Sequence, residues 1–287
     1  MSLVYLNGDF VAAEEARISP LDRGFLFADG IYEVIPAYNS TLFRFDAHMA
    51  RLDRSLAAIN LANPFDHQGW RELCQSLIDQ NGGGNVSVYL QVTRGTSMKR
   101  DHAFPNPPVN PTIFMMTSPI AVPEADSPDN AVGAAAITLD DIRWARCDIK
   151  SVSLLPNSLL RQQAVANGAA EAILLKDGFV TEGAASNVFV VMAGRIVTPP
   201  KNHAILGGVT RDVVVDLCRE HDIPLDETEI SEFDLTQAEE IWVTSSTKEI
   251  VPIVSLNNRP VANGQPGPLW RLVAGHYVQR KRQLCGH

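Results

Sequence analysis

The first part of the chain alternates apolar and polar residues in the way that β-strands do. Short apolar runs at residues 4–6 and 9–11 flank Asn7-Gly8, a pair that suits a tight type I′ turn, so a β-hairpin is expected there. Residues 30–38 alternate one by one and end at Asn39-Ser40, which predicts a second hairpin. Two further strand-like runs are residues 86–93 and 112–117. The chain therefore begins with a sheet.

Between these strands, apolar residues recur at every third or fourth position, which is the helical period. The pattern predicts a helix over residues 47–60, with Asp46 as its N-cap. It predicts a second helix over residues 70–80, which ends at Asn81 and the three glycines that follow it. The first part of the chain is thus expected to contain two helices between its strands.

A proline-rich stretch with little periodicity comes next, and it is the best candidate for a linker. We place an N-terminal α/β domain at residues 1–118, a linker at 119–131 and a larger C-terminal domain at 132–287. The C-terminal part has no repeated strand–helix–strand unit and no Gly-x-Gly-x-x-Gly motif, so a mixed α+β fold is favoured over a dinucleotide-binding fold. Its expected strands are residues 134–138, 172–175, 187–191 and 241–244, and its expected helices are residues 157–166 and 210–221.

Composition and charge exclude several classes of protein. With 287 residues, 45% hydrophobic and 20% charged, the chain is typical of a globular protein. Its formal net charge of -9 has the wrong sign for binding nucleic acid or an anionic membrane. The four cysteines lie far apart without metal-ligand spacing, so neither a metal site nor a disulfide framework is expected. The start has no signal-peptide pattern and no run reaches the ~18 apolar residues of a membrane span, so we expect a cytoplasmic protein.

Six lysines occur in the chain, and one of them has an unusual setting. Lys176, Lys201 and Lys281 lie in turn-like or tail-like contexts, where a lysine is a solvated charge. Lys150 instead lies between Ile149 and a largely apolar stretch. If it is desolvated there, its amine can attack a carbonyl compound and form a Schiff base. The alternative is an edge-strand lysine that extends its ammonium group to water.

Two clusters are suited to an anion such as phosphate. Gly207-Gly208 leads into a helix start at Val209-Thr210, where free backbone N–H groups, the helix dipole and a hydroxyl come together. Ser245 and Ser246 belong to a run of hydroxyl residues that closes a strand. Arg51 on the first predicted helix could add a forked contact to the same phosphate. An ordinary capped helix, a polar strand end and a solvated arginine are the alternatives.

Glu182 is a single acidic residue among small and neutral neighbours, just before a strand. A carboxylate in such a place needs a buried cationic partner, because otherwise it would be protonated. The protonated ring nitrogen of a pyridine is one such partner. A lysine amine, an anion cradle and a carboxylate for a ring nitrogen are together what pyridoxal phosphate requires of a protein.

Four motifs occur in the order and at the spacing of a known family. They are Asp22-Arg-Gly-Phe-Leu-Phe-Ala-Asp-Gly-Ile-Tyr-Glu-Val, Arg143-Trp-Ala-Arg-Cys-Asp-Ile-Lys, Thr181-Glu-Gly-Ala-Ala-Ser-Asn-Val-Phe and Gly207-Gly-Val-Thr-Arg. From about residue 3 to about residue 275 the chain resembles the class IV, fold-type IV aminotransferases, which use pyridoxal 5'-phosphate. The resemblance implies a two-domain α+β fold, with a smaller N-terminal α/β domain and a larger C-terminal domain built on a mixed-sheet pseudo-barrel.

The resemblance also implies the roles of individual residues. Lys150 would be the imine lysine, and Glu182 would bind the pyridine nitrogen. Leu206 would pack against the cofactor ring. The phosphate would be bound by Arg51, Val209, Thr210, Ser245 and Ser246.

Within the family, the resemblance is greatest to its D-amino acid-specific branch. Tyr32, Arg100 and His102 resemble the site that binds the substrate α-carboxylate there, and in the family the Arg and His come from the partner subunit. This implies a homodimer that acts on small amino acids and 2-oxo acids by a ping-pong reaction through pyridoxamine phosphate. The loop differs from the family pattern in having two residues, Met98-Lys99, in place of one, so Lys99 could compete with Arg100.

Three alternatives remain open from the sequence. A branched-chain L-amino acid aminotransferase would share the cofactor residues but is not expected to have the Arg100-x-His102 pair. An aminodeoxychorismate lyase would share the cofactor and release pyruvate without an amino acceptor. A protein that uses the fold for binding only would not need Lys150 and Glu182.

Overall fold

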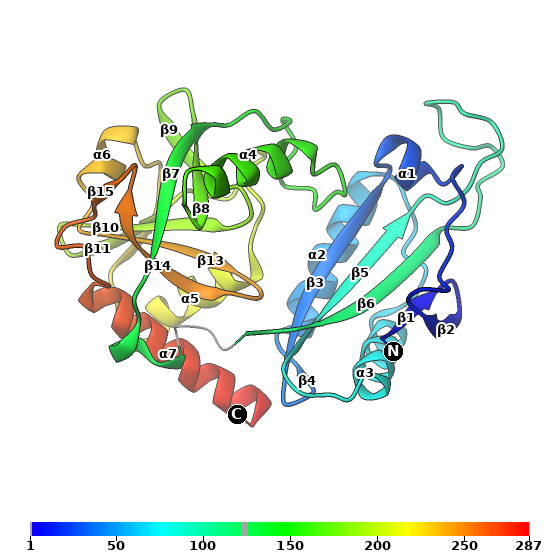
Figure 1. Ribbon diagram of the computed structural model, residues 1–287, viewed down its shortest axis with the longest axis horizontal. Coiled ribbons are helices and arrows are strands. Elements are labelled where there is room, and N and C mark those ends of the chain that lie inside the picture. The colour runs from blue at the N-terminus through cyan, green and yellow to red at the C-terminus, as the bar shows by residue number, and fades with distance from the viewer. Residues whose placement is uncertain (1, 122–125, 287) are drawn as a thin grey trace. The chain divides into compact units, whose positions relative to one another are not determined.

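The computed structural model describes residues 2–121 and 126–286, which form two compact units (Figure 1). Unit 1 comprises residues 2–120, 149–153 and 284–286, and unit 2 comprises the other described residues. The sequence prediction assigned residues 149–153 and 284–286 to the C-terminal domain, whereas their contacts are with unit 1. Of the expected linker 119–131, residues 122–125 lie outside the described residues, Pro119 ends a strand, and Pro128–Asn130 form one turn of 3-10 helix.

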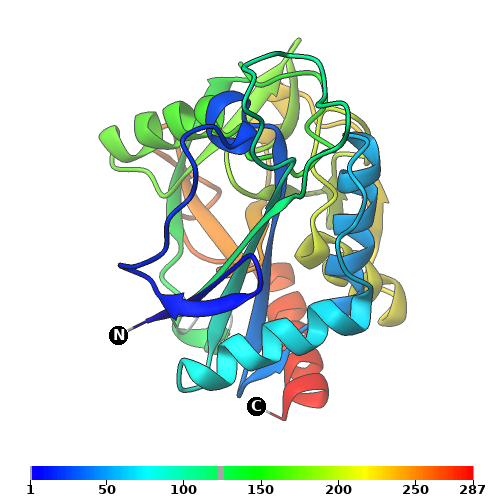
Figure 2. The same cartoon turned by 90° about the vertical axis from the view of Figure 1, so that its right-hand side faces the viewer.

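Unit 1 is an antiparallel sheet covered by helices. Its strand order is β2-β1-β6-β5-β3-β4, and every neighbouring pair is antiparallel. The strands are β1 (Leu3–Leu6), β2 (Asp9–Ala12), β3 (Gly30–Tyr38), β4 (Thr41–Leu42), β5 (Val86–Thr93) and β6 (Thr112–Pro119). The helices are α1 (Arg23–Phe27), α2 (Phe45–Ala58) and α3 (His67–Gln80). Figure 2 shows helices α2 and α3, and their apolar residues share one core with β3, β5 and β6.

Both hairpins predicted in this unit are confirmed. Asn7 and Gly8 have positive φ angles of 52° and 117°, as the tight turn between β1 and β2 requires. The expectation that Asp46 caps a helix is wrong. Helix α2 begins at Phe45 after Arg44, whose φ is 54°, and Asp46 lies within the first turn, where its carboxylate still favours the positive end of the helix dipole.

Unit 2 is built on a nine-stranded mixed sheet. The order is β12-β11-β10-β13-β14-β7-β8-β9, with β15 paired to β14, and the parallel pairs are β11–β12, β14–β7 and β7–β8. The strands are β7 (Ala134–Asp140), β8 (Glu171–Lys176), β9 (Phe179–Gly183), β10 (Asn187–Met192), β11 (Arg195–Thr198), β12 (Leu225–Glu227), β13 (Glu240–Ser245), β14 (Glu249–Leu256) and β15 (Arg259–Pro260). One apolar cluster takes residues from strands along nearly the whole order, so the sheet curls around its own core. The predicted pseudo-barrel is confirmed.

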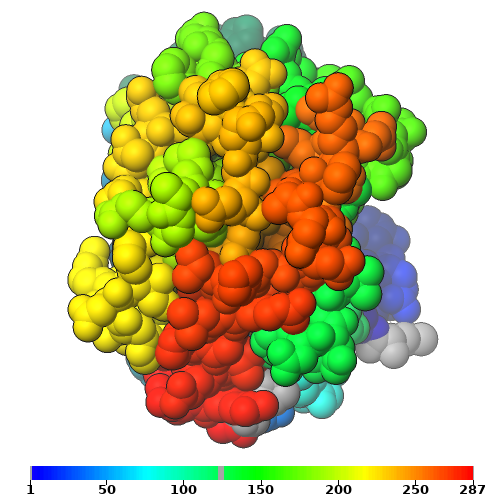
Figure 3. Space-filling model, turned by 90° about the vertical axis from the view of Figure 1, so that its left-hand side faces the viewer, coloured from blue at the N-terminus to red at the C-terminus, as the bar shows by residue number. Residues whose placement is uncertain are grey.

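The helices of unit 2 include two, α6 (Glu232–Thr236) and α7 (Pro268–Cys285), that the sequence analysis missed. The others are α4 (Leu155–Ala166) and α5 (Val209–Glu220). Helix α7, shown in red, crosses one face of unit 2 in Figure 3. It buries Trp270, Tyr277 and also Lys281, which is 0% exposed. The interpretation of Lys281 as a solvated tail charge is therefore wrong.

Two further properties bear on function. None of the helices in residues 2–121 and 126–286 is long and apolar enough to cross a membrane. The four cysteines are free and buried.

Candidate active site

Lys150 lies in unit 1, where its backbone extends the sheet beside β3. Its carbonyl oxygen accepts a hydrogen bond from the Tyr32 N–H at 2.9 Å, and its own N–H donates to Ser55 Oγ on α2 at 3.2 Å. The preceding residue, Ile149, is part of the apolar core. The Lys150 amine lies 4.1 Å from the centre of the Tyr32 ring. Tyr32 thus contacts both the backbone and the amine of Lys150, and Ser55 fixes its N–H, so the position of the amine is restricted.

Arg51 forms a buried cluster with two residues that the sequence analysis did not consider. Its guanidinium group donates from Nε to Glu33 Oε1 at 2.7 Å and from Nη2 to Glu33 Oε2 at 2.8 Å. Burial raises the pKa of Glu33, but Arg51 and His48 outweigh this, and the net pKa lies well below its usual range. Burial also lowers the pKa of His48, which favours a neutral ring. The forked contact expected for a phosphate is made here to a carboxylate.

Glu182 lies in unit 2 at the centre of a polar network. One oxygen, Oε1, accepts from Arg143 Nη1. The other, Oε2, accepts from Asn187 Nδ2 and from the Leu206 N–H, each at 3.0 Å. Arg143 also makes a forked contact to Asp141, through Nε at 2.9 Å and Nη2 at 2.7 Å. Both carboxylates and the guanidinium are about 95% buried.

The charges of this network do not balance. Two buried carboxylates, Asp141 and Glu182, share the single positive charge of Arg143. The Arg143 hydrogen bonds overcome the effect of burial at Asp141, whose pKa is lowered. At Glu182 burial dominates, with a smaller contribution from Asp141, and raises the pKa to about 7 against the opposing effect of Arg143. A second cation beside Glu182, such as a protonated ring nitrogen, would complete the network.

Asn187 connects Glu182 to the predicted phosphate cradle. Its side chain donates to the Leu206 carbonyl oxygen at 2.8 Å, and it lies opposite Thr244 in the β10–β13 pair. A Cβ atom on Gly208 would come within 2.0 Å of Asn187 Oδ1, so only glycine allows this approach at the start of α5. The carboxylate and the helix N-terminus are therefore built around one amide side chain.

The start of helix α5 has no side-chain cap among the residues that the structure describes. Helix α5 begins at Val209, and its N-cap, Gly208, offers no side chain to bind the first N–H groups. Thr210 is buried in this first turn. The buried hydroxyl of Thr244, at the end of β13, has no hydrogen-bond partner among the described residues. An anion at this helix start would satisfy both the N–H groups and a nearby hydroxyl.

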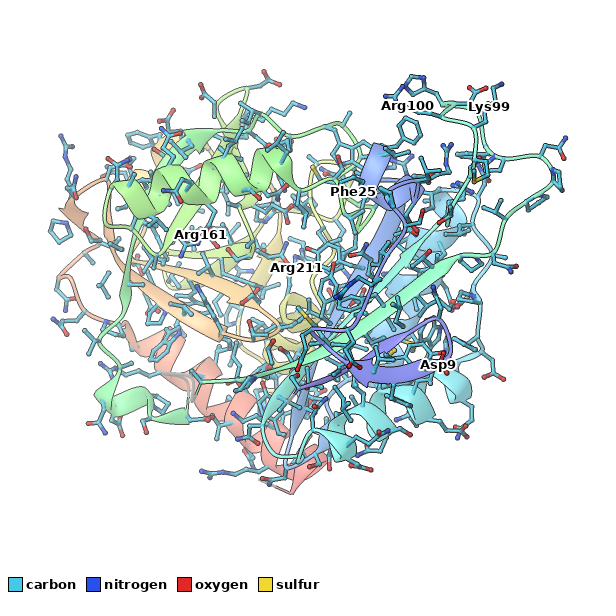
Figure 4. The ribbon with its side chains drawn as sticks, turned by 45° about the vertical axis from the view of Figure 1, so that its right-hand side comes forward. Asp9, Phe25, Lys99, Arg100, Arg161 and Arg211 are labelled. Atoms are coloured by element: carbon cyan, nitrogen blue, oxygen red, sulfur yellow. The ribbon has the colours of Figure 1, made fainter. Side chains whose placement is uncertain are left out.

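Arg100 and His102 lie in unit 1, on the loop between β5 and β6. Both side chains are exposed and rest against the Phe27 ring, the Arg100 Cζ at 5.1 Å and the His102 ring at 5.2 Å from its centre. Figure 4 shows Lys99 and Arg100 at the tip of this loop. Lys99 makes an ion pair with Asp101 at 2.8 Å, so its charge is engaged within the loop.

The predicted site residues thus fall into two groups. Tyr32, Arg51, Arg100, His102 and Lys150 belong to unit 1. Glu182, Leu206, Val209, Thr210, Ser245 and Ser246 belong to unit 2.

Comparison with known proteins identifies the family. Residues 30–256 match the family described as amino-transferase class IV. The chain belongs to the class IV aminotransferases. It is 40% identical over 270 residues to the D-alanine aminotransferase of Bacillus licheniformis, covering 94% of each chain. It is 36% identical over 287 residues to that of Listeria monocytogenes strain 10403S, covering 99% of this chain and 97% of the relative.

Solved structures show the same fold. The branched-chain amino acid aminotransferase of Escherichia coli superposes with a TM-score of 0.89 at 23% identity, covering 97% of this chain and 94% of that one. The T.th. branched-chain enzyme bound to N-(5'-phosphopyridoxyl)-L-glutamate superposes with a TM-score of 0.86 at 25% identity, covering 99% and 94%. The predicted α+β fold of fold type IV is confirmed.

The side chains of this class IV aminotransferase fit pyridoxal 5'-phosphate, the cofactor of the family. The unbalanced charge at Glu182 suits a protonated pyridine nitrogen. The uncapped start of α5 and the unpartnered Thr244 hydroxyl suit a phosphate group. The Lys150 amine suits the aldehyde. Each part of the cofactor thus has a chemical counterpart among the described residues.

Sequence reasoning missed Glu33, Arg143 and Asn187, whereas Thr244 belongs to the hydroxyl run that was expected to suit a phosphate. Glu33 could have been noticed, because it lies on the same face of an alternating strand as Ile31 and Ile35 and must therefore be buried with a partner. Asn187 could not, because its contact with Glu182 forms only where the chain turns between β9 and β10, and its other partner, Leu206, lies on a separate loop.

Glu182 gives this aminotransferase a testable pH dependence. Its pKa in the folded, cofactor-free protein is about 7, above the ordinary value of 4.5. The folded state therefore keeps a proton that the unfolded state releases, and the free energy of unfolding falls as the pH rises from about 4.5 to about 7. Glu182→Gln removes this pH-dependent contribution to the free energy of unfolding. As the pH rises from about 5 to about 8, we expect the free energy of unfolding of the variant to increase by up to about 3 kcal/mol relative to that of the wild type.

Urea unfolding of the cofactor-free proteins at the two pH values measures this difference. Glu232→Gln, at an exposed position on α6, is the control and should follow the wild type at both pH values. If the Glu182→Gln and wild-type profiles run parallel, Glu182 is already ionised throughout this range.

Proposed function

We propose that this aminotransferase moves the amino group of a D-amino acid such as D-alanine to a 2-oxo acid such as 2-oxoglutarate. The observation that carries transamination is the buried Glu182 network, which lacks one positive charge beside its carboxylate. The preference for D-amino acids is supported by the D-alanine aminotransferases that are about 40% identical over 94% of the chain. The position of Arg100 and His102 on an exposed loop supports it further.

When bound, pyridoxal phosphate supplies an aldehyde that takes up amino groups and a ring that accepts electrons released at the substrate Cα. Lys150 Nζ would hold the aldehyde in the resting enzyme, and its freed amine would then act as the general base at the substrate Cα. Its fixed backbone keeps the amine within reach of the proton that it moves.

Arg143 and Asn187 keep the Glu182 carboxylate in one orientation, in which it would hold the proton of the ring nitrogen. Leu206 would pack against the ring. Groups from α5 and from the β13–β14 turn would bind the phosphate, together with a guanidinium group. These groups are Arg51, Val209, Thr210, Ser245 and Ser246.

The substrate carboxylate binds Tyr32, Arg100 and His102. A guanidinium group takes both carboxylate oxygens, while the phenol and the imidazole restrict the angle of approach. Arg100 and His102 act on the site of a partner subunit, so the working enzyme is a homodimer. Their exposure on unit 1 is compatible with this arrangement.

The enzyme works in a reducing compartment, the cytoplasm. All four cysteines are free and buried, which suits a compartment where disulfides do not form. Burial raises the pKa of Cys74 and of Cys218 to about 12, so both thiols stay protonated and unreactive.

The visible absorption spectrum of the cofactor-loaded protein tests this function. We expect D-alanine to convert the spectrum to that of the pyridoxamine form, and we expect L-leucine to leave it unchanged at the same concentration. Conversion by L-leucine alone would replace the proposal with branched-chain L-amino acid transamination. No response to either amino acid, together with release of pyruvate from aminodeoxychorismate without a 2-oxo acid, would replace it with the lyase reaction.

A further inference from the structure

The loop that carries Arg100 and His102 spans residues 94–111 and contains no helix or named strand. Irregular loops of this length are usually either functional or disordered. This loop is tied together at its base. A Cβ atom on Gly95 would lie 1.9 Å from the Asn110 carbonyl oxygen, so glycine alone lets the two ends of the loop approach. The Gly95 carbonyl oxygen accepts from the Arg23 N–H at 2.9 Å.

The tip of the loop is held by the side chain of the same arginine. Arg23 Nη1 donates to the carbonyl oxygens of Asp101 at 2.6 Å and Ala103 at 3.2 Å, and Nη2 donates to that of His102 at 3.1 Å. Three consecutive carbonyl groups thus converge on one planar donor. Because a guanidinium group presents its N–H bonds in fixed directions, this contact selects a single backbone arrangement at the tip.

Arg23 is in turn held in place by contacts with Asp29 and Phe27. Its Nε donates to Asp29 Oδ2 at 2.8 Å, and its side chain is 4% exposed. Its Cζ lies 4.8 Å from the Phe27 ring, the same ring against which Arg100 and His102 rest. The buried Arg23 guanidinium group therefore contacts both the backbone of residues 101–103 and the Phe27 ring on which the Arg100 and His102 side chains pack.

We propose that Arg23 is a positioning residue for the substrate carboxylate site. It is too buried to touch substrate, and it acts by holding the residue 101–103 backbone so that Arg100 and His102 are already placed when the carboxylate arrives. Such preorganisation lowers the cost of ordering the loop at binding. The inference rests on the carboxylate role that the proposed function gives to Arg100 and His102.

Arg23→Lys tests this inference. It keeps the positive charge beside Asp29 but loses the guanidinium N–H groups that bind the carbonyl oxygens of residues 101–103. In the holoenzyme we expect the KM for D-alanine to rise about tenfold with kcat within about twofold, well inside the ~100-fold that a misplacement of 1 Å can cost. In an Arg100→Ala, His102→Ala background, the same change should alter the KM by less than about twofold, because nothing remains to be positioned. A full tenfold effect in that background would assign Arg23 to general stability and overturn the inference.

Limited proteolysis gives a readout that does not depend on activity. Trypsin cleaves after Lys99 and Arg100, and we expect Arg23→Lys to accelerate cleavage there in the holoenzyme. Arg94→Lys is the matched control. Arg94 Nε donates to the same Asp29 oxygen at 2.8 Å, and its Cζ lies 3.6 Å from the centre of the Phe104 ring in the loop. Its other donors bind the carbonyl groups of Ile59 and Asn60, so it does not hold the backbone of residues 101–103. Its cleavage rate should stay near that of the wild type.

The outcomes separate this inference from the proposed function. Equal cleavage of the wild type and Arg23→Lys overturns the inference whatever the kinetics show, since a loop that becomes no looser was not held by Arg23. Faster cleavage with an unchanged KM shows a held loop that takes no part in substrate capture, which also overturns the inference. If Arg100→Ala alone leaves the KM unchanged as well, the carboxylate assignment in the proposed function fails with it.

Discussion

Lys150→Ala is expected to lower the rate of transamination by at least ~10⁴-fold. The variant loses both the amine that holds the cofactor aldehyde and the base that moves the Cα proton. The fold should survive, because the contacts that fix residue 150 are made by its backbone N–H and carbonyl groups, which alanine keeps. Single-turnover measurements with D-alanine, followed through the absorbance of the bound cofactor, measure the loss.

Two controls make the Lys150 result specific. Lys176→Ala removes an exposed lysine and should leave turnover within about twofold of the wild type. Borohydride would reduce the carbon–nitrogen double bond between cofactor and lysine to a stable single bond. In the wild type, mass spectrometry should then find the added mass of the cofactor on the tryptic peptide 147–161. Added mass elsewhere, or a Lys150→Ala variant that keeps most of its turnover, would mean that another amine holds the cofactor.

The elements that the sequence predicts well are those whose signal is local. The hairpin at Asn7-Gly8 follows from the positive φ angles that only a few residues adopt at low cost. The start of α2 was misplaced because an acidic residue favours both the N-cap and the first turn, and Asp46 occupies the first turn. Helix α7 went unpredicted even though Trp270, Val273 and Tyr277 recur at helical spacing, since a cluster of basic residues at its end was interpreted as a tail.

The site could be predicted only as far as its chemistry is carried by residue type. Lys150 and Glu182 differ from their neighbours in the chain, so the sequence alone could single them out as candidates for the roles proposed above. The orientation of Glu182 depends on Arg143 and Asn187, which reach it from other segments. Arg51 was expected to bind only a phosphate, because the carboxylate that it contacts, Glu33, lies on a different element. Such pairings arise from tertiary packing and have no local signature.

Lys281→Met is expected to cost unit 2 about 3–5 kcal/mol of unfolding free energy. The Lys281 ammonium group pairs with Glu249 at 2.9 Å and with Asp126, and both Lys281 and Glu249 are 0% exposed. Removing the cation leaves the Glu249 carboxylate buried without its lysine, which is the costly case for a buried ion pair. Urea unfolding followed by the fluorescence of the buried Trp242 and Trp270 reports on this unit.

The same substitution should also weaken the phosphate site, because Glu249 lies directly opposite Ser245 in the β13–β14 pair and has a φ of 59°. A residue in this left-handed region keeps its conformation only while its surroundings hold it. Lys281→Met should therefore bind pyridoxal phosphate more weakly while binding pyridoxal, which lacks the phosphate, almost as before.

Two further variants control the stability result. Lys248→Met removes an exposed charge from the β13–β14 turn and should change the free energy of unfolding by less than about 0.5 kcal/mol. Adding Glu249→Gln to Lys281→Met should recover part of the lost stability, since it removes the carboxylate that was left behind. A loss below about 1 kcal/mol for Lys281→Met would show that water or a rearranged side chain replaces the lysine at little cost.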